Sequence, residues 1–259
     1  MLTLNSTHNC PFCRFSYIIL KTDFFFHNMS HPYRKPPVVL EDGFIFYSLG
    51  HGAALTSERL PFAERLRFDS HEYQELNSIF STKDEAVTTM FGKTYPTGRK
   101  EALWGLQSYT FSGRTITESP MTEVVSQFIS FISSRFKVKP GDIWVFGNKY
   151  DTKKGIGDHS DDETNYVGPG MVATLSISPG LDRTFRIKPK QKSPKVPPRV
   201  DAPLTHGTCV FMMGKVTPGK EVDSFQENYT HGIPVLGKRA LSSATGSIER
   251  ISLTARFKV

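Results

Sequence analysis

Cysteine is scarce in this sequence, with three cysteines among 259 residues, at positions 10, 13 and 209. This count excludes the disulfide framework of small secreted domains, so we expect a reducing compartment. Cys10 and Cys13 have the spacing of a redox motif or of half a zinc site, but no second Cys/His pair lies nearby and no βαβ pattern follows. The cysteines therefore predict an intracellular protein, in the nucleus or elsewhere, and give little support for a site of their own.

Long apolar runs are also absent. Near the N-terminus, the runs Tyr17 to Leu20 and Phe24 to Phe26 are far shorter than the roughly 20 residues with which a helix crosses a bilayer. No basic segment is followed by a continuous apolar stretch, which argues against a secretory signal. We therefore expect a soluble protein without membrane contact, in which residues 1–40 form a flexible leader. We also expect it to be a monomer.

Acidic residues are missing from one strongly basic segment, residues 183–199. The chain has 32 lysines and arginines against 25 aspartates and glutamates, a formal net charge of +7. Seven of the basic residues lie in this segment, and without them the balance is 32 − 7 = 25 against 25. The excess is therefore local, which is typical of a surface that binds phosphates. The alternative is a loop that is merely solvated.

Periodic segments predict a mixed first half and an almost wholly β second half. Helices are indicated at 71–80, with Asp69 or Ser70 as N-cap, and at 120–136, with Ser119 as N-cap and Pro120 in the first turn. Strands are expected at 43–49, 89–93, 109–113, 143–150, 171–178, 184–188, 208–213, 229–233 and 251–258. The predicted fold class is mainly β (α+β), a sandwich or barrel in one domain over residues 41–259.

The segment NKYDTKKGIGDHSDDE, residues 148–163, contains the strongest chemical signal. If it is extended, His159 and Asp161 point the same way, because side chains two residues apart share a face of a strand. One further histidine would complete the two-histidine, one-carboxylate set that binds non-haem Fe(II) and leaves positions open. We prefer His231, between a polar run and an apolar stretch, to His206, whose place at the start of an apolar strand suggests a structural role.

The closing segment Arg250 to Arg256 gives independent support. Its residues alternate, so that Arg250, Ser252, Thr254 and Arg256 share one face of a strand. Two arginines on the inner face of a barrel are costly unless they meet anions. A dicarboxylate would satisfy both, with one guanidinium at each end. The alternative is that both arginines lie at strand ends and reach solvent.

Together these motifs resemble the AlkB family of Fe(II)/2-oxoglutarate dioxygenases over about residues 85 to 259. The resemblance is carried, in chain order, by Asn148-Lys-Tyr150, His159-Ser-Asp161, His231 and Arg250-x5-Arg256. The eukaryotic branch that repairs double-stranded DNA is resembled more locally, at Phe91-Gly-Lys93, Arg99-Lys100, Tyr109 to Gly113, His159 to Glu163 and His206-Gly207. This implies a double-stranded β-helix (jelly-roll) core over 141–259 and a helix/strand nucleotide-recognition extension over 41–140.

The resemblance also implies roles for individual residues. His159, Asp161 and His231 would hold iron and form the catalytic centre. The 2-oxoglutarate site would consist of Asn148, Tyr150, Arg250, Ser252 and Arg256, although Ser252 stands where the family often has Asn. In the substrate site, Phe111 would stack on a flipped base, Phe91 would fill the gap left in the duplex and Arg99 would steady that region, while the pocket would be lined by Tyr109, Ser112, Asp162 and Glu163. The alternative for each aromatic residue is core packing.

The implied activity is oxidative demethylation of 1-methyladenine and 3-methylcytosine in DNA. Such an enzyme needs Fe(II), 2-oxoglutarate and O2, with ascorbate as reductant in vitro, and releases formaldehyde, succinate and CO2. A base inside a duplex is out of reach, so it must be flipped out, which costs least for a damaged pair. Two alternatives stay open, namely the same chemistry on methylated RNA or a protein side chain, and a non-enzymatic DNA-binding module with a structural metal.

Overall fold

The computed structural model describes residues 38–39, 45–51, 53–90, 92–111, 113–150, 155–161, 171–192, 198–215, 223–237 and 249–257. The expected leader, residues 1–40, lies outside them except for β1. The larger of two main sheets has the order β1 (Val38–Val39), β2 (Ile45–Gly50), β3 (Ala53–Arg59), β14 (Thr208–Gly214), β11 (Met171–Ile177), β16 (Arg250–Phe257), β9 (Ile143–Tyr150) and β6 (Arg99–Trp104). The smaller sheet has the order β10 (Ile156–His159), β15 (Tyr229–Ile233), β12 (Arg183–Pro189) and β13 (Val200–Leu204).

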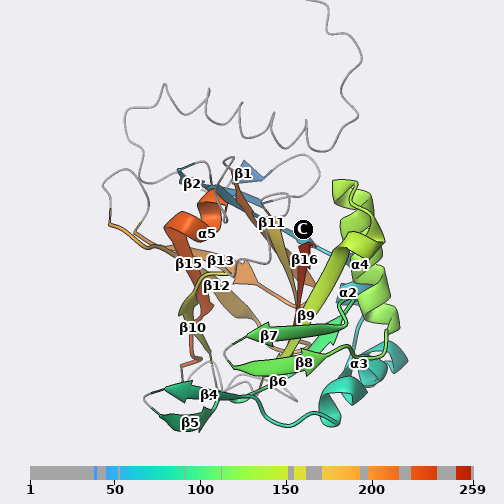
Figure 1. Cartoon of the computed structure of the whole chain (residues 1–259). Coiled ribbons are helices and arrows are strands. Elements are labelled where there is room, and N and C mark those ends of the chain that lie inside the picture. The colour runs from blue at the N-terminus through green and yellow to red at the C-terminus, as the bar shows by residue number, and fades with distance from the viewer. Residues whose placement is uncertain are drawn as a thin grey trace, which may run out of the picture.

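The second half of the chain runs back and forth between these two sheets (Figure 1). Strand β9 lies in the larger sheet, β10 in the smaller and β11 in the larger again. The hairpin β12–β13 then belongs to the smaller sheet, and β14, β15 and β16 alternate as before. All of these pairings are antiparallel. Antiparallel strands that wrap in this order around a common interior form the expected jelly roll.

Helices cover the outer face of the larger sheet, at the right of Figure 1. They are α2 (Pro61–Glu64), α3 (His71–Ser81) and α4 (Glu123–Phe136). Ser70 caps α3, as expected, but α4 begins later than predicted, with Thr122 as N-cap in place of Ser119. The reason is that the preceding residues are bound to β6, because Ser119 N donates to Leu103 O at 2.7 Å and Trp104 Nε1 donates to Pro120 O at 2.7 Å.

Two hairpins extend from this body at the bottom of Figure 1. The first joins β4 (Val87–Met90) to β5 (Lys93–Pro96), and the second joins β7 (Ser108–Phe111) to β8 (Arg114–Thr117). A single strand over 89–93 was therefore wrong, because the chain turns back between Met90 and Lys93, where Gly92 has a φ of 74°. Positive φ is inexpensive only for glycine, which explains the residue at this turn.

Strand β16 lies between the apolar cluster beneath the helices and the space between the two sheets. Ile251, Leu253, Ala255 and Phe257 pack into the apolar cluster that holds the helices to the larger sheet. The other face of β16 therefore points between the two sheets. That face carries Arg250, Ser252, Thr254 and Arg256, all buried. The alternation expected from the sequence is present, and it places two guanidinium groups inside the barrel.

Candidate active site

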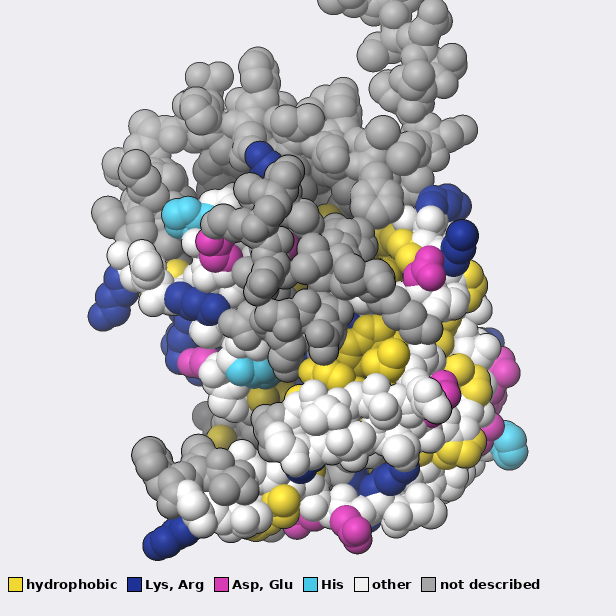
Figure 2. Space-filling model, viewed as in Figure 1, with side chains coloured by type: hydrophobic (Ala, Val, Ile, Leu, Met, Phe, Trp, Pro, Cys, Tyr) yellow, Lys and Arg dark blue, Asp and Glu magenta, His cyan; other side chains and the backbone are white. Residues whose placement is uncertain are grey.

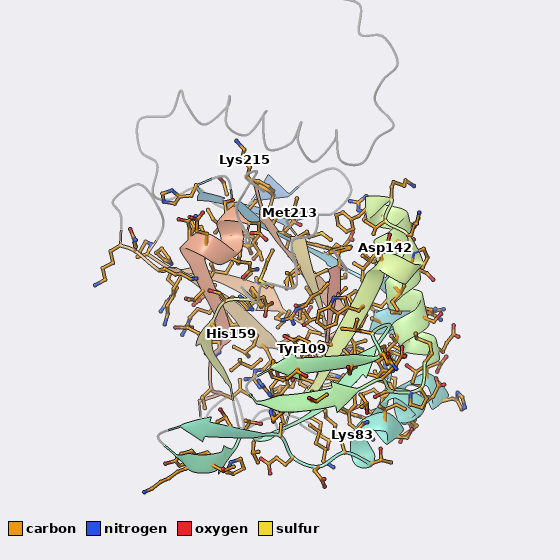
Figure 3. The ribbon with its side chains drawn as sticks, in the orientation of Figure 1. Lys83, Tyr109, Asp142, His159, Met213 and Lys215 are labelled. Carbon is orange, nitrogen blue, oxygen red and sulfur yellow. The ribbon has the colours of Figure 1, made fainter. Side chains whose placement is uncertain are left out.

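A cavity of about 670 Å³ opens between the two sheets. Strand β16 contributes all four polar side chains of its inner face to the lining. Strand β9 contributes Asn148 and Tyr150, which pair directly with Ser252 and Arg250 in the sheet. His159 of β10 and Tyr109 of β7 line the same cavity (Figure 3). The cavity thus collects residues that lie far apart in the sequence.

Three candidate metal donors converge in this cavity. The ligand atoms of His159, Asp161 and His231 all lie within 4.8 Å of one another. His231 Nε2 is 3.6 Å from Asp161 Oδ2, and His159 Nε2 is 4.0 Å from Asp161 Oδ1. The pairing of β10 with β15 places His159 directly opposite His231. Two imidazoles therefore point the same nitrogen at one carboxylate, as in a facial two-histidine, one-carboxylate site.

The protonation states of these groups suit a metal. His159 Nδ1 is 2.9 Å from Gly157 O, and because a carbonyl can only accept, Nδ1 is the donor and Nε2 is the nitrogen that faces Asp161. Burial lowers the pKa of His231 to about 4, so its imidazole is neutral near pH 7. Burial alone would raise the pKa of Asp161, but Arg256, His231 and His159 outweigh it and hold the pKa at about 2. Neutral imidazoles and an ionised carboxylate are the forms that bind a metal.

His231 should make the stability of the metal-free protein depend on pH. Because its folded pKa of about 4 lies below the ordinary value of 6.5, its contribution is complete above pH 6.5 and is lost as the pH falls from 6.5 towards 4. Burial also lowers the pKa of His206, which acts with the same sign. We expect His231→Gln to weaken the dependence of the free energy of unfolding on pH, measured by urea unfolding. His71→Gln, on the exposed face of α3, should leave this dependence unchanged. If His231→Gln keeps the full pH dependence of the wild type, the lowered pKa of His231 is contradicted.

The two arginines of β16 differ in their surroundings. Arg256 Nη2 contacts Asp161 Oδ1 at 2.6 Å, which ties Arg256 to the metal end of the cavity. Arg250 is 2% exposed, and its guanidinium lies 4.4 Å from the centre of the Tyr150 ring. Within the described part of the chain, Arg250 forms no ion pair with a carboxylate, and burial lowers its pKa. A buried guanidinium of this kind can hold an anionic ligand.

The predicted substrate residues lie on the hairpin side of the cavity. Tyr109 and Phe111 stack with ring centres 5.0 Å apart, and Phe146 meets Phe111 edge-on at 5.4 Å. Arg99 also lines the cavity, and its Nε donates to Glu101 Oε1 at 2.8 Å. The other predicted substrate residues fall outside the described part of the chain, namely Phe91, Ser112, Asp162 and Glu163.

Glu101 and Arg114 belong to this region, although neither was predicted. Glu101 is 6% exposed and receives Arg114 Nη1 at 3.0 Å as well as Arg99. The guanidinium of Arg114 lies 4.8 Å from the centre of the Phe111 ring, within the range of a cation–π contact. The sequence held one usable signal, since Glu101 is two residues from Arg99 and shares its strand face. These ion pairs fix Arg99 and support Phe111.

In its described residues, 183–192 and 198–199, the basic segment is partly buried and partly paired with acidic residues. Arg183 is 4% exposed and points into the barrel, where its Nη2 donates to Pro234 O at 2.9 Å. Arg186 makes two bonds to Asp201, at 2.8 and 3.0 Å, and Lys188 contacts Asp158 at 2.6 Å. At the left of Figure 2, basic and acidic side chains lie together in the region where Figure 1 places β10 and β12. Acids from neighbouring strands therefore neutralise part of the predicted patch.

His206 has the structural role that the sequence suggested. Its Nε2 lies 2.9 Å from Leu66 O, and its Nδ1 accepts from Ser178 N at 3.1 Å. Both ring nitrogens are thus used to join the chain before α3 to the end of β11. His206 has no nitrogen left for a metal.

A family model described as the 2OG-Fe(II) oxygenase superfamily matches residues 74–256. The chain belongs to this superfamily. It is 30% identical over 195 residues to the DNA oxidative demethylase ALKBH2 of Homo sapiens, covering 71% of this chain and 69% of that protein. The ALKBH2 of Bos taurus is 32% identical over 151 residues, or 54% of this chain and 52% of that protein. The expected AlkB-like dioxygenase, similar to the eukaryotic DNA-repair branch, is confirmed.

A further relative is the alpha-ketoglutarate-dependent dioxygenase alkB homolog 3 of Rattus norvegicus, 30% identical over 154 residues, 54% of this chain and 46% of that protein. The chain thus spans about half the length of the bovine and rat relatives. Two solved structures are distantly similar. An oxidoreductase of the 2OG-Fe(II) oxygenase family from Burkholderia pseudomallei is 13% identical, with a TM-score of 0.43 over 79% of this chain and 84% of that one. OsALKBH1 is 14% identical, with a TM-score of 0.42 over 82% and 99%.

As a member of the 2OG-Fe(II) oxygenase superfamily, the protein is a dioxygenase that uses Fe(II), 2-oxoglutarate and O2. The donor set of two imidazoles and one carboxylate fits Fe(II), and the buried Arg250 fits a carboxylate of 2-oxoglutarate. Iron bound by such a set keeps open positions at which 2-oxoglutarate and O2 can react. In the described part of the chain, every helix is too short or too polar to cross a membrane.

Proposed function

We propose that this dioxygenase is an oxidative demethylase of N-alkylated bases in DNA, with 1-methyladenine and 3-methylcytosine as substrates. One observation carries the proposal: a single cavity is lined by the metal donors, by both arginines of β16 and by the aromatic hairpin β7–β8. An N-methyl group on a base stacked against that hairpin would face the metal donors. The similarity to proteins named DNA oxidative demethylase supports the same substrate class.

In this proposal, His159, Asp161 and His231 hold the iron. Arg250 binds the distal carboxylate of 2-oxoglutarate with Tyr150 beside it, while Asn148 and Ser252 contribute polar contacts from the same wall. Arg256 orients Asp161 at the metal end of this wall. The chain's own contribution is thus to fix the distal end of the co-substrate and to keep the donor carboxylate ionised.

The base side of the proposal depends on Phe111. A flipped base would stack on this ring, which also contacts Tyr109, Phe146 and Arg114. Phe91, which falls between β4 and β5 in the sequence, is proposed to occupy the vacated position in the duplex, and Ser112, Asp162 and Glu163 to complete the base pocket. Exposed lysines such as Lys192 would contact duplex phosphates. The enzyme would read damage without reading sequence, because stacking tolerates any base.

Phe111→Ala should weaken substrate binding and leave co-substrate binding intact. Loss of one base–aromatic stack costs about 1–3 kcal/mol, so KM for a methylated oligonucleotide should rise between about 5-fold and 150-fold. The affinity for 2-oxoglutarate, measured by calorimetry on the metal-loaded protein, should stay the same. Phe131→Ala, at a partly buried position of α4 that packs against the apolar cluster beneath the helices, is a control for packing loss away from the cavity. Equal effects of the two substitutions on KM would argue against a stacking role.

The substrate class can be tested with matched oligonucleotides that each carry one 1-methyladenine, as duplex DNA, single-stranded DNA and RNA. Protein loaded with Fe(II) under argon is given air and 2-oxoglutarate, and base mass and formaldehyde are followed. Loss of one methyl group from DNA, with one formaldehyde formed, is the expected result. Activity confined to RNA would move the substrate to RNA, and succinate without methyl loss on any oligonucleotide would contradict nucleic-acid demethylation.

A further inference from the structure

The candidate metal donors come from two separate segments of the chain. His159 ends β10 and Asp161 follows it, whereas His231 lies in β15. Directly before β15 lies the short helix α5 (Ser224–Asn228), capped by Asp223, whose carboxylate accepts from Phe225 N at 2.8 Å and Gln226 N at 3.1 Å. Helix α5 and His231 therefore belong to one continuous segment of the chain. A contact between α5 and Asp161 fixes the distance between Asp161 and His231.

Gln226 makes that connection. Its side chain is 2% exposed, and its Oε1 accepts from the backbone N–H of Asp161 at 2.9 Å. Beside it, Ser160 Oγ donates to Tyr229 O at 3.0 Å. The two residues after β10 are thus bonded to α5 and to the first residue of β15.

The bond from Asp161 to Gln226 has a direct geometric consequence. It fixes the peptide that carries the Asp161 carboxylate at the end of β10, where strand pairing no longer does so. The carboxylate lies between two imidazoles, 3.6 Å from one Nε2 and 4.0 Å from the other. A rotation of this peptide would move the carboxylate away from both.

The amide nitrogen of Gln226 indicates that stability alone does not account for a glutamine at this position. Gln226 Nε2 is buried and has no hydrogen-bond partner in the structure as described. A buried donor without a partner costs free energy, which an apolar side chain of similar length would avoid. Methionine has that length and lacks the acceptor.

We propose that Gln226 is a positioning residue of the iron site, which acts by holding the backbone of Asp161 against the segment that carries His231. The inference rests on the proposed metal site. Gln226 does not touch the cavity, so its effect passes through Asp161. Substitution of residues that orient metal ligands typically costs 10–100-fold in metal affinity.

The test compares Gln226→Met with Thr122→Ala under argon. Thr122 is a matched control, because it is 3% exposed and its oxygen likewise accepts a backbone N–H, that of Val125 at 3.4 Å, but in α4. Dissociation constants for Mn(II) and Fe(II) are measured by calorimetry, and thermal unfolding is measured on the metal-free proteins. We expect Gln226→Met to bind both metals about 10–100-fold more weakly. We also expect it to unfold no lower than Thr122→Ala, which itself binds metal like wild type.

Asp161→Ala distinguishes a failure of the proposed metal site from a failure of the positioning role of Gln226. If Asp161→Ala binds metal like wild type, the metal site itself is wrong, and the positioning role falls with it. If Asp161→Ala loses the metal and Gln226→Met binds it like wild type, the site stands and the positioning role is refuted. A Gln226→Met protein that unfolds well below Thr122→Ala and loses metal only in proportion would show a structural role and would also overturn the proposal.

Discussion

Asp161→Ala should abolish turnover of 2-oxoglutarate and destabilise the protein at the same time. The substitution removes the one carboxylate of the metal site and leaves Arg256 buried, at 6% exposure, without the oxygen that it contacts at 2.6 Å. Breaking a buried ion pair from one side costs about 3–5 kcal/mol of unfolding free energy. Succinate formation with Fe(II) and O2, and urea unfolding, measure the two effects separately.

Asp161→Asn provides the control for folding. The amide has the size of the carboxylate and keeps an oxygen acceptor for Arg256, so we expect a smaller loss of stability. It carries no negative charge for the metal, so turnover should still be lost. Wild-type rates of succinate formation in either variant would show that the catalytic metal lies elsewhere.

Arg250→Met should weaken the binding of 2-oxoglutarate and leave metal binding intact. The guanidinium is 2% exposed at the opposite end of β16 from Arg256, and its proposed partner is the distal carboxylate. Truncating one partner of a buried, hydrogen-bonded charge pair costs at least about 2 kcal/mol, or about 30-fold in affinity. Calorimetric titration of the Mn(II)-loaded protein with 2-oxoglutarate measures this directly.

Arg186→Met is the matched control for a lost arginine. Arg186 lies on β12 and is paired with Asp201 at the surface, away from the cavity lining. Its substitution should leave 2-oxoglutarate affinity unchanged. Similar affinities in Arg250→Met and wild type would mean that the co-substrate lies elsewhere in the cavity.

The parts of the site that could be predicted from the sequence depend on local periodicity. Alternation in β16 was enough to place Arg250, Ser252, Thr254 and Arg256 on one face, because a strand has a side-chain period of two. Sequence surroundings also distinguished His231 from His206, since only one of them lies between a polar and an apolar stretch. Both inferences use neighbouring residues alone.

Two of the strands that the sequence did not indicate, β6 and β13, have a physical reason in common. Strand β6 begins Arg-Lys-Glu and resembles a polar loop, but it lies at an edge of the larger sheet, where Arg99 and Glu101 pair with each other. Strand β13 contains Pro203, which a central strand would not tolerate. Its place at the edge of the smaller sheet explains the exception. Edge positions thus relaxed the rules on which strand prediction depends.

The contacts that tune the site could not be predicted, because their partners are distant in sequence. Asp161 and Arg256 are 95 residues apart, and Asp161 and Gln226 are 65 apart. Such pairs exist only after strands that are distant in sequence have come together in the fold. The same holds for Asp158, which takes part of the charge of the basic segment. The roles of Phe91, Ser112, Asp162 and Glu163 stay predictions.

The most direct test of the account is a crystal structure with Mn(II) and 2-oxoglutarate bound under argon, with the metal located by anomalous scattering. We predict a single strong peak in bonding distance of His159, Asp161 and His231, with 2-oxoglutarate extending from it to Arg250. A peak at another set of residues, or 2-oxoglutarate that does not reach Arg250, would contradict the central claim that this cavity is the active site.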